Sequence, residues 1–501
     1  MEKLILGIDI GTTSVKTILI SSAGKIVDET TQDHDLLSAH PGWAEEDALV
    51  WWQDAVATVK RMAERHPEMM ASVRGIGVSG MVPAIVMLDE KGEPVCNTIQ
   101  QNDARAVEQI RRVKERLDQA ELFGRIGGYT NQQHVIPRLL WVKEQEPSVY
   151  ERTRWVMGSY DYIVYQLTGK RSVEWNWAVE SGMFDIRRKE WITEYMEPFG
   201  IRPSLFPEVH ASDEIVGTVS EAAAALTGLP AGIPVIAGAA DHVASTLAAG
   251  IIHTGDLLIK FGGAGDILYC VDEIRPCDRL FFDYHIVPGK YLLNGCMAAS
   301  GSLVKWYLKN ILGEYDGDVL KRLDQEAEKV PAASEGLIIL PYFVGEKTPI
   351  FDPEARGVLF GLTLAHQREH IFRAVLESVI YGFRHHVDVL KESGYRAAHI
   401  YATNGGAKSS FWCQIAADVL GSTVTSYPTH PGSALGVAFL AGMKTGVFSQ
   451  WEQIREFLGG GKVYHPNPEN VKIYDKSYEI YRGLYEALKG SCQAVQKLYK
   501  E

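Results

Sequence analysis

The chain has 501 residues, 46% hydrophobic and 23% charged, which is an ordinary globular composition and implies two or more domains. Asp and Glu (63) outnumber Lys and Arg (50), and the formal net charge of −13 disfavours a protein that coats nucleic acid or anionic membrane. The six cysteines form no Cys-x-x-Cys pair, so we expect no zinc ribbon or disulfide framework but a reducing, cytoplasmic setting. No apolar run approaches the roughly 18 residues of a membrane helix.

The first 28 residues predict an antiparallel meander. Apolar, β-branched runs at 4–10 and 15–20 flank the turn Gly11-Thr12-Thr13, and a third short strand is expected at 25–27. A dinucleotide fold or a P-loop requires a strand, a glycine loop and then a helix. Here the glycine loop joins two strands, so a different kind of site is indicated.

The same strand-glycine-strand pattern returns near the middle of the chain. Residues 257–261 are apolar, 262–265 read Gly-Gly-Ala-Gly, and 266–269 lead into a second strand. This repeat predicts two related α/β halves with a boundary near residues 245–255. Helical spacing of apolar residues predicts helices at 47–65, 161–168, 243–249, 371–383 and 411–420.

Residues 9–16, Asp-Ile-Gly-Thr-Thr-Ser-Val-Lys, carry the groups that a nucleoside triphosphate requires. A glycine turn exposes backbone N–H groups to phosphate, and a carboxylate can hold hydrated magnesium. A hairpin with Gly and Thr is also common structural punctuation, so this motif alone decides little. The second hairpin and Gly405-Gly406 at a helix start strengthen phosphate binding, because glycine lets the backbone approach an anion.

Asp241 follows a strand and a run of small residues, directly before a predicted helix. Asp is a favoured helix N-cap, which is one interpretation. A base that deprotonates an alcohol attacking a γ-phosphate also needs this placement, which is the other.

The segment His366-Gln-Arg-Glu369-His370 matches the H-x-x-E-H pattern of inverted zinc peptidases, in which two histidines hold zinc and the glutamate is the base. No third ligand is identifiable. The polar residues suit a solvated first helical turn, so zinc is the less favoured interpretation.

Taken together, the order of these motifs resembles the FGGY carbohydrate kinases of the actin/hexokinase/Hsp70-like ATPase superfamily, closest to the xylulokinase-like branch. Residues 357–377 are the most specific segment and resemble the C-terminal signature of that family. The resemblance implies two ribonuclease-H-like α/β domains, 1–245 for sugar binding and 246–501 for nucleotide binding, with a closing cleft between them. It implies ATP and Mg²⁺ as cofactors and a small sugar or polyol as substrate, with no nucleic-acid or membrane partner. A homodimer is an assembly compatible with it.

The resemblance also implies roles for individual residues. Asp241 would be the catalytic base. Substrate would be bound by Asn102, Asp103, Arg105, Asp241 and His242. ATP would be bound by Gly11, Thr12, Thr13, Ser14, Lys16, Gly262, Gly263, Gly405, Gly406 and Ser409. Magnesium would be held by Asp9 and Asp241.

The chain departs from the family pattern near the expected sugar. The family's Ser-Gly-Gln-Met-His-Gly is here Ser-Gly-Met-Val-Pro-Ala at residues 79–84, which removes a histidine that reads a hydroxyl. Gly263 also stands where the family has Thr, which removes a hydroxyl from the second hairpin. We therefore expect D-xylulose to be a poor substrate and a polyol, another short ketose or a sugar acid to be better, the acid through Arg105.

The alternative is an actin- or Hsp70-like conformational ATPase that acts on protein partners. The cluster around Asp103 and the base at Asp241 favour the kinase, because a purely conformational ATPase needs no substrate pocket.

Overall fold

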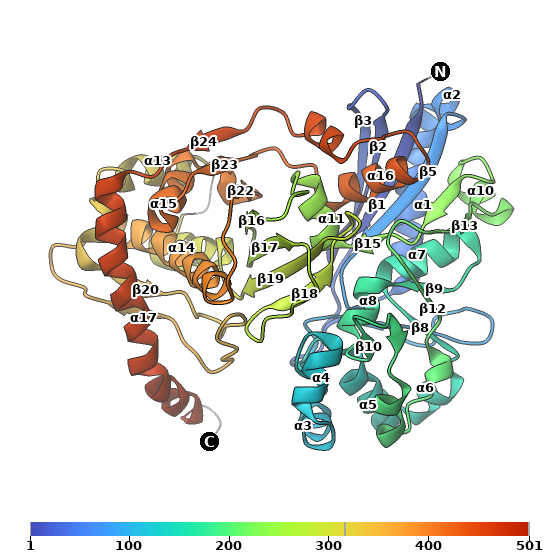
Figure 1. Ribbon diagram of the computed structural model, residues 1–501, viewed down its shortest axis with the longest axis horizontal. Helices are drawn as coiled ribbons and strands as arrows, with labels where there is room; N and C mark the ends of the chain where they lie inside the picture. Colours follow the sequence, from blue (N-terminus) through green and yellow to red (C-terminus); the bar gives the residue numbers. More distant parts are fainter. Residues whose placement is uncertain (1, 315–316, 499–501) are drawn as a thin grey trace.

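Two seven-stranded mixed sheets organise the chain in the computed structural model, which describes residues 2–314 and 317–498 (Figure 1). In the first sheet β1, β2 and β3 are antiparallel neighbours, which confirms the predicted meander, and β5 runs parallel to β1. Its strands, in spatial order, are β13 (Ile215–Thr218), β14 (Pro234–Ile236), β5 (Val73–Gly80), β1 (Leu4–Ile10), β2 (Ser14–Ser21) and β3 (Ile26–Asp33), with β15 (Ala239–Ala240) beside β5.

The second sheet repeats the central arrangement of the first. Strand β16 is antiparallel to β17 on one side and parallel to β22 on the other, as β1 is to β2 and β5. The predicted repeat of two α/β halves is therefore confirmed. The strands, in spatial order, are β18 (Phe281–Tyr284), β19 (Tyr291–Met297), β17 (Gly265–Val271), β16 (Asp256–Phe261), β22 (His399–Thr403), β23 (Val424–Ser426) and β24 (Lys462–Tyr464).

The predicted helices form where the apolar periodicity placed them. Asp47 caps the first of them by accepting a hydrogen bond from the Leu49 N–H at 2.9 Å, and Gly169 and Gly421 end two others in the left-handed conformation. The helices of the first half are α1 (Ala48–Arg65), α7 (Ser159–Thr168), α10 (Glu221–Thr227) and α11 (Asp241–Ala248). Those of the second half are α12 (Gly301–Tyr307), α13 (Gly317–Ala327), α14 (Arg368–Glu392), α15 (Ser410–Leu420), α16 (Ser433–Lys444) and α17 (Pro468–Lys497).

Helix α16 lies against the first sheet although it belongs to the second half of the chain, and Figure 1 shows it in orange among the blue strands. The approach is so close that only glycine fits. A Cβ atom on Gly77 would lie 2.2 Å from the Val437 carbonyl oxygen, and one on Gly436 would lie 2.0 Å from that of Ala244 in α11. Helices α11 and α16 therefore pack together at the join between the halves. The linear division at 245/246 stays a prediction.

Shorter elements surround the two sheets. In the first half these are β4 (Glu45–Glu46), β6 (Val86–Leu88), β7 (Thr98–Ile99), β8 (Trp155–Met157), β9 (Ser172–Glu174), β10 (Phe184–Asp185), β11 (Glu190–Trp191), β12 (Glu208–His210), α2 (Pro67–Met70), α3 (Val107–Arg116), α4 (Gln119–Ile126), α5 (Val135–Gln145), α6 (Pro147–Arg152), α8 (Trp175–Glu180) and α9 (Thr193–Met196). In the second half β20 (Ile338–Leu340) pairs with β21 (Val358–Phe360). Within residues 2–314 and 317–498, none of the helices combines the length and apolar character that a bilayer crossing needs.

Candidate active site

The first hairpin places a carboxylate beneath a turn that is rich in hydroxyl groups. The Gly11 N–H donates to the Ser14 carbonyl at 3.0 Å, and the hydroxyls of Thr12, Thr13 and Ser14 make no hydrogen bond to other described residues. Asp9 accepts a hydrogen bond from the Ser79 hydroxyl at 2.8 Å. Burial and the nearby negative charge of Asp241 raise the pKa of Asp9 to about 6.

Asp241 is the first residue of α11, and its side chain is 41% exposed. The N-cap position is Ala240, so the interpretation of Asp241 as a helix cap is wrong. Burial alone would raise the pKa of Asp241, but a hydrogen bond from His242 and the charges of His242 and Lys260 hold it below its usual value. An ionised carboxylate therefore stands at the join between the two sheets.

His242 links Asp241 to a second carboxylate. Its Nδ1 lies 3.5 Å from Asp241 Oδ1, and its Nε2 lies 3.1 Å from Asp283 Oδ2 on β18. Burial alone would lower the pKa of His242, but Asp283 and Asp241 together raise it well above its ordinary value. The imidazolium form is therefore favoured between the two acids.

The second hairpin carries no hydroxyl in its turn, Gly262-Gly263-Ala264-Gly265. The Gly405-Gly406 turn packs against it, because a Cβ on Gly406 would lie 2.6 Å from Phe261 Cβ. Ser409 caps α15 by accepting from the Trp412 N–H at 3.0 Å and donates to Asp324 at 2.7 Å. The Ser409 hydroxyl is thus used within the protein, and the carbonyl oxygens of Gly262 and Gly263 accept from the N–H groups of Gly301 and Ser300 at 2.8 and 2.9 Å.

The predicted sugar-binding cluster is buried and bound to itself. Arg105 donates to Asp103 Oδ2 at 2.8 Å and to Glu45 Oε1 at 2.6 Å, and its guanidinium lies 3.8 Å from the centre of the Trp43 ring. Its side chain is only 2% exposed. Direct contact between Arg105 and a sugar stays a prediction, and in this structure protein carboxylates occupy the guanidinium. Asn102 lies on the adjacent exposed turn.

Other polar groups near Asp241 were not predicted from the sequence. Asp283 is fully buried, receives a hydrogen bond from Asn294, and keeps one carboxylate oxygen without a partner among the described residues. Burial and Asp283 raise the pKa of Glu180, at the end of α8, to about 8. These residues are far apart in sequence, and only an acidic residue at the end of a short strand could have hinted at Asp283.

Arg138 on α5 fixes residues 81–83, the buried apolar segment between β5 and β6. It donates to the carbonyl oxygens of Pro83 at 3.0 Å and Gln100 at 2.7 Å, with no carboxylate partner among the described side chains. Burial lowers its pKa to about 9. Both side-chain polar atoms of Gln100 are buried without a partner in the described part of the chain. The guanidinium of Arg138 therefore fixes this segment through its hydrogen bond to the backbone carbonyl of Pro83.

The H-x-x-E-H segment does not present two histidines on one helix, because α14 begins at Arg368, after His366. His366 Nδ1 accepts the Thr363 N–H at 2.9 Å, and His370 lies 3.5 Å from Glu335. Among residues 2–314 and 317–498, no group of three or more His, Cys, Asp or Glu side chains is arranged around a metal position. The segment serves as an ordinary helix start.

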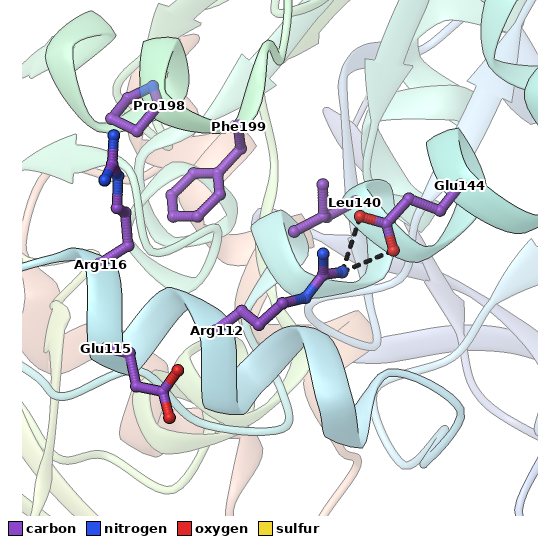
Figure 2. Close-up of a pocket in the computed structure, with 7 residues that line it drawn as sticks. All are labelled: Arg112, Glu115, Arg116, Leu140, Glu144, Pro198 and Phe199. Atoms are coloured by element: carbon purple, nitrogen blue, oxygen red, sulfur yellow. Dashed lines mark hydrogen bonds and ion pairs between the residues drawn. The ribbon is translucent and has the colours of Figure 1, made fainter.

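A surface depression of about 390 Å³ between α3 and α5 shares no residue with this site (Figure 2). Arg112 binds both carboxylate oxygens of Glu144 at its edge, at 2.5 and 2.6 Å. The depression is wide and open, and its charged groups are exposed or already paired. It carries no sign of catalytic chemistry.

The fold has two sheets of the same central arrangement, each with a glycine hairpin. This is the two-domain ATPase fold of the actin and hexokinase type. Models of the N-terminal and C-terminal domains of the FGGY family of carbohydrate kinases match residues 4–248 and 280–445. The chain belongs to the FGGY family of carbohydrate kinases.

Relatives of known name align with nearly the whole chain. The xylulose kinase of Bacillus subtilis (strain 168) is 29% identical and covers 99% of this chain and 100% of its own length. The gluconokinase of the same organism is 27% identical, with 97% and 96% covered. The crystal structure of xylulose kinase from Rhodospirillum rubrum is 40% identical, with a TM-score of 0.93 and 98% and 100% covered. The protein is therefore an ATP-dependent kinase that phosphorylates a small sugar-like substrate.

Proposed function

We propose that ATP binds with its phosphates between the two hairpins and that Asp241 is the base of the transfer. The observation that carries this proposal is the position of Asp241. It is a partly exposed, ionised carboxylate within electrostatic reach of Asp9 on one sheet and Lys260 on the other. A general base must lie where the attacking hydroxyl and the γ-phosphate meet, and this join is the place that both sheets share.

The reaction follows from that placement. The substrate hydroxyl gives its proton to Asp241 while its oxygen forms a bond to the γ-phosphorus. The bond between that phosphorus and the β–γ bridging oxygen breaks, and ADP leaves. Positioning and charge stabilisation carry most of the catalysis, because phosphoryl transfer asks for little covalent chemistry from the protein.

We propose that Asp9 and Asp241 hold Mg²⁺, and their chemistry fits that ion. Magnesium is commonly bound by one or two carboxylates together with phosphate oxygens and water. Burial and, after it, the negative charge of Asp241 raise the pKa of Asp9, and a divalent cation would offset both effects. When bound, the ion supplies neutralisation of charge on the phosphates.

For the substrate we propose a neutral polyol or short ketose. His242, the cation next to Asp241, is already bound by the carboxylates of Asp241 and Asp283. A sugar acid would bring a further negative charge close to these two carboxylates. Arg105, the group expected to favour an acid, is occupied by Asp103 and Glu45. Residues 81–83 are buried and have no polar side chain, so they offer few hydrogen bonds to the hydroxyls of a substrate. Several relatives are named for xylulose, and we expect D-xylulose to be a poor substrate here.

A coupled ADP assay across ketoses, aldoses, polyols and sugar acids tests this proposal. We expect a neutral polyol or a short ketose other than D-xylulose to give the highest kcat/KM. A lead of tenfold or more for D-xylulose, about 1.4 kcal/mol in transition-state binding, would overturn the substrate proposal and leave the kinase activity intact. A highest kcat/KM for a sugar acid would instead show that an exposed cation such as Lys347 offsets the negative charge of the carboxylates beside His242.

We also propose a cytoplasmic location and a homodimer. The six cysteines are free, which suits a reducing compartment. Light scattering coupled to size-exclusion chromatography measures the assembly. A mass of one 55.6 kDa chain across the micromolar range would contradict the dimer.

A further inference from the structure

The two hairpins carry opposite charges at equivalent positions. Asp9 stands two residues before Gly11 and pairs in register with Lys16 across β1 and β2. Lys260 stands two residues before Gly262 and pairs in register with Asp266 across β16 and β17. The second hairpin thus has a cation where the first has its carboxylate.

Strand packing turns Lys260 toward the first sheet. Successive side chains of a strand point to opposite faces, so Lys260 shares a face with Leu258, while Ile259 and Phe261 share the other. Leu258 belongs to the apolar core of the first half, and Ile259 and Phe261 belong to that of the second. Lys260 therefore lies on the face between the halves, next to α11.

The contacts of Lys260 leave donor capacity unused. Its ammonium group lies 3.2 Å from the Ser245 hydroxyl on α11 and 3.3 Å from Asp266 Oδ2, and its side chain is 13% exposed. An ammonium group has three N–H donors, and the described residues occupy two of them at long distances. Burial alone would lower the pKa of Lys260, but Asp266 and Asp241 raise it, so the group stays charged.

Lys260 interacts electrostatically with two neighbouring titratable groups. Asp241 interacts with Lys260, and His430 interacts with both Lys260 and Lys16. Burial and these two lysines lower the pKa of His430 to about 4, so it is neutral and adds no charge of its own. Lys16 itself pairs with Glu29 on β3 at 2.9 Å, so Lys260 is the hairpin cation whose charge acts on Asp241.

We propose that Lys260 is a catalytic residue that contacts the γ-phosphoryl group of ATP. The inference rests on the proposed placement of ATP between the hairpins. The first hairpin offers three hydroxyls that bind no other described residue, whereas the second has none in its turn, so a point charge takes their place. Lys260 keeps its proton throughout. It stabilises the negative charge of the transferred group while the hydroxyl proton goes to Asp241 and the oxygen of ADP leaves.

The variants Lys260→Met and Lys260→Arg test this role through nucleotide discrimination. For Lys260→Met we expect kcat to fall by about 100-fold or more, as for loss of one preorganised donor. The affinity for a non-hydrolysable ATP analogue, measured by calorimetry without sugar, falls by about tenfold or more, while that for ADP changes little. Lys260→Arg keeps the charge and restores part of the rate. Lys290→Met, at a half-buried lysine on the β18–β19 turn that donates to Thr254 at 2.7 Å, is the matched control.

A structural role would give different results. If Lys260 only pairs with Asp266, then Asp266→Asn reproduces the phenotype of Lys260→Met, both nucleotides lose affinity equally, and the melting temperature falls with them. That outcome overturns the inference, as does an unchanged kcat in Lys260→Met. Wild-type protein that phosphorylates no compound of the panel would instead defeat the proposed function, so the two failures are distinguishable.

Discussion

The two glycine hairpins occupy equivalent places in their sheets and yet differ in the groups they offer. The β1–β2 hairpin presents a carboxylate and three hydroxyls, and the β16–β17 hairpin presents glycines and a lysine. Backbone geometry is common to both, because each is an antiparallel pair with a parallel strand on its outer side. The comparison teaches that the two halves share a backbone arrangement, while the side chains at equivalent positions differ and can take different functions. The first hairpin has groups suited to holding a metal ion and to donating hydroxyl hydrogen bonds, and the second supplies the positive charge of a lysine.

The largest effect is expected at the carboxylate between the hairpins. Asp241→Asn keeps the size of the side chain and removes the proposed base, so kcat should fall by about 10²–10⁴ with little change in nucleotide affinity. Steady-state kinetics with calorimetry for ATP measures both. Asp213→Asn, at a half-buried turn residue that pairs with Lys444 at 3.0 Å, is the control. Near-full activity in Asp241→Asn would show that neither hairpin delivers phosphate to this residue.

The carboxylate of the first hairpin should rank second. Asp9→Asn removes a proposed magnesium ligand, and kcat/KM for MgATP should fall by at least the about 10–100-fold that loss of a group supporting a metal ligand costs. A titration with Mg²⁺ should recover part of the lost rate at high concentration. A rate that is low but independent of Mg²⁺ would assign Asp9 a purely structural role beside Ser79.

The contact between the first sheet and α16 offers a test of stability rather than chemistry. Gly77→Ala places a Cβ atom against the Val437 carbonyl, and such overpacking costs about 1–3 kcal/mol. The melting temperature should fall by several degrees. Gly490→Ala in α17 adds its Cβ atom to open space and should not lower it. Equal melting temperatures for the two variants would mean that α16 is not held tightly on the first sheet.

The smallest effects should come from exchanging hydroxyls between the hairpins. Thr13→Ala removes one free hydroxyl, and a hydrogen bond worth about 0.5–1.5 kcal/mol predicts a rise in KM for ATP of roughly twofold to tenfold. Gly263→Thr adds a hydroxyl where the structure has open space, and KM should stay level or fall. A rise in KM for Gly263→Thr as large as that for Thr13→Ala would show that the second hairpin requires glycine for close backbone approach.

Much of the fold could be predicted from the sequence because its signals are local. Alternating apolar runs around glycine turns predicted both hairpins, and apolar spacing predicted the main helices. The antiparallel pairing of β1 with β2 follows from a short turn that leaves the chain no other partner nearby. Asp241 was also identified from its place after a strand and small residues, although its role stays a proposal.

The rest depends on contacts between distant segments, and the sequence pattern does not encode these. Asp103 and Arg105 suggest a ligand site when taken as a motif, but Glu45 and Trp43 from 58 or more residues away enclose them. Glu180 and Asp283 come near His242 only because α8 and β18 meet beside α11.

The sequence by itself determined the repeated hairpins, the helices and the family, because turns, periodicity and motif order are properties of neighbouring residues. Only the tertiary structure decided that α16 returns to the first sheet, that Arg105 is already paired, and that Lys260 donates to Ser245 on α11. Burial and charge at a site are sums over everything packed around it. A residue's role there is therefore fixed by neighbours that stand far away along the chain.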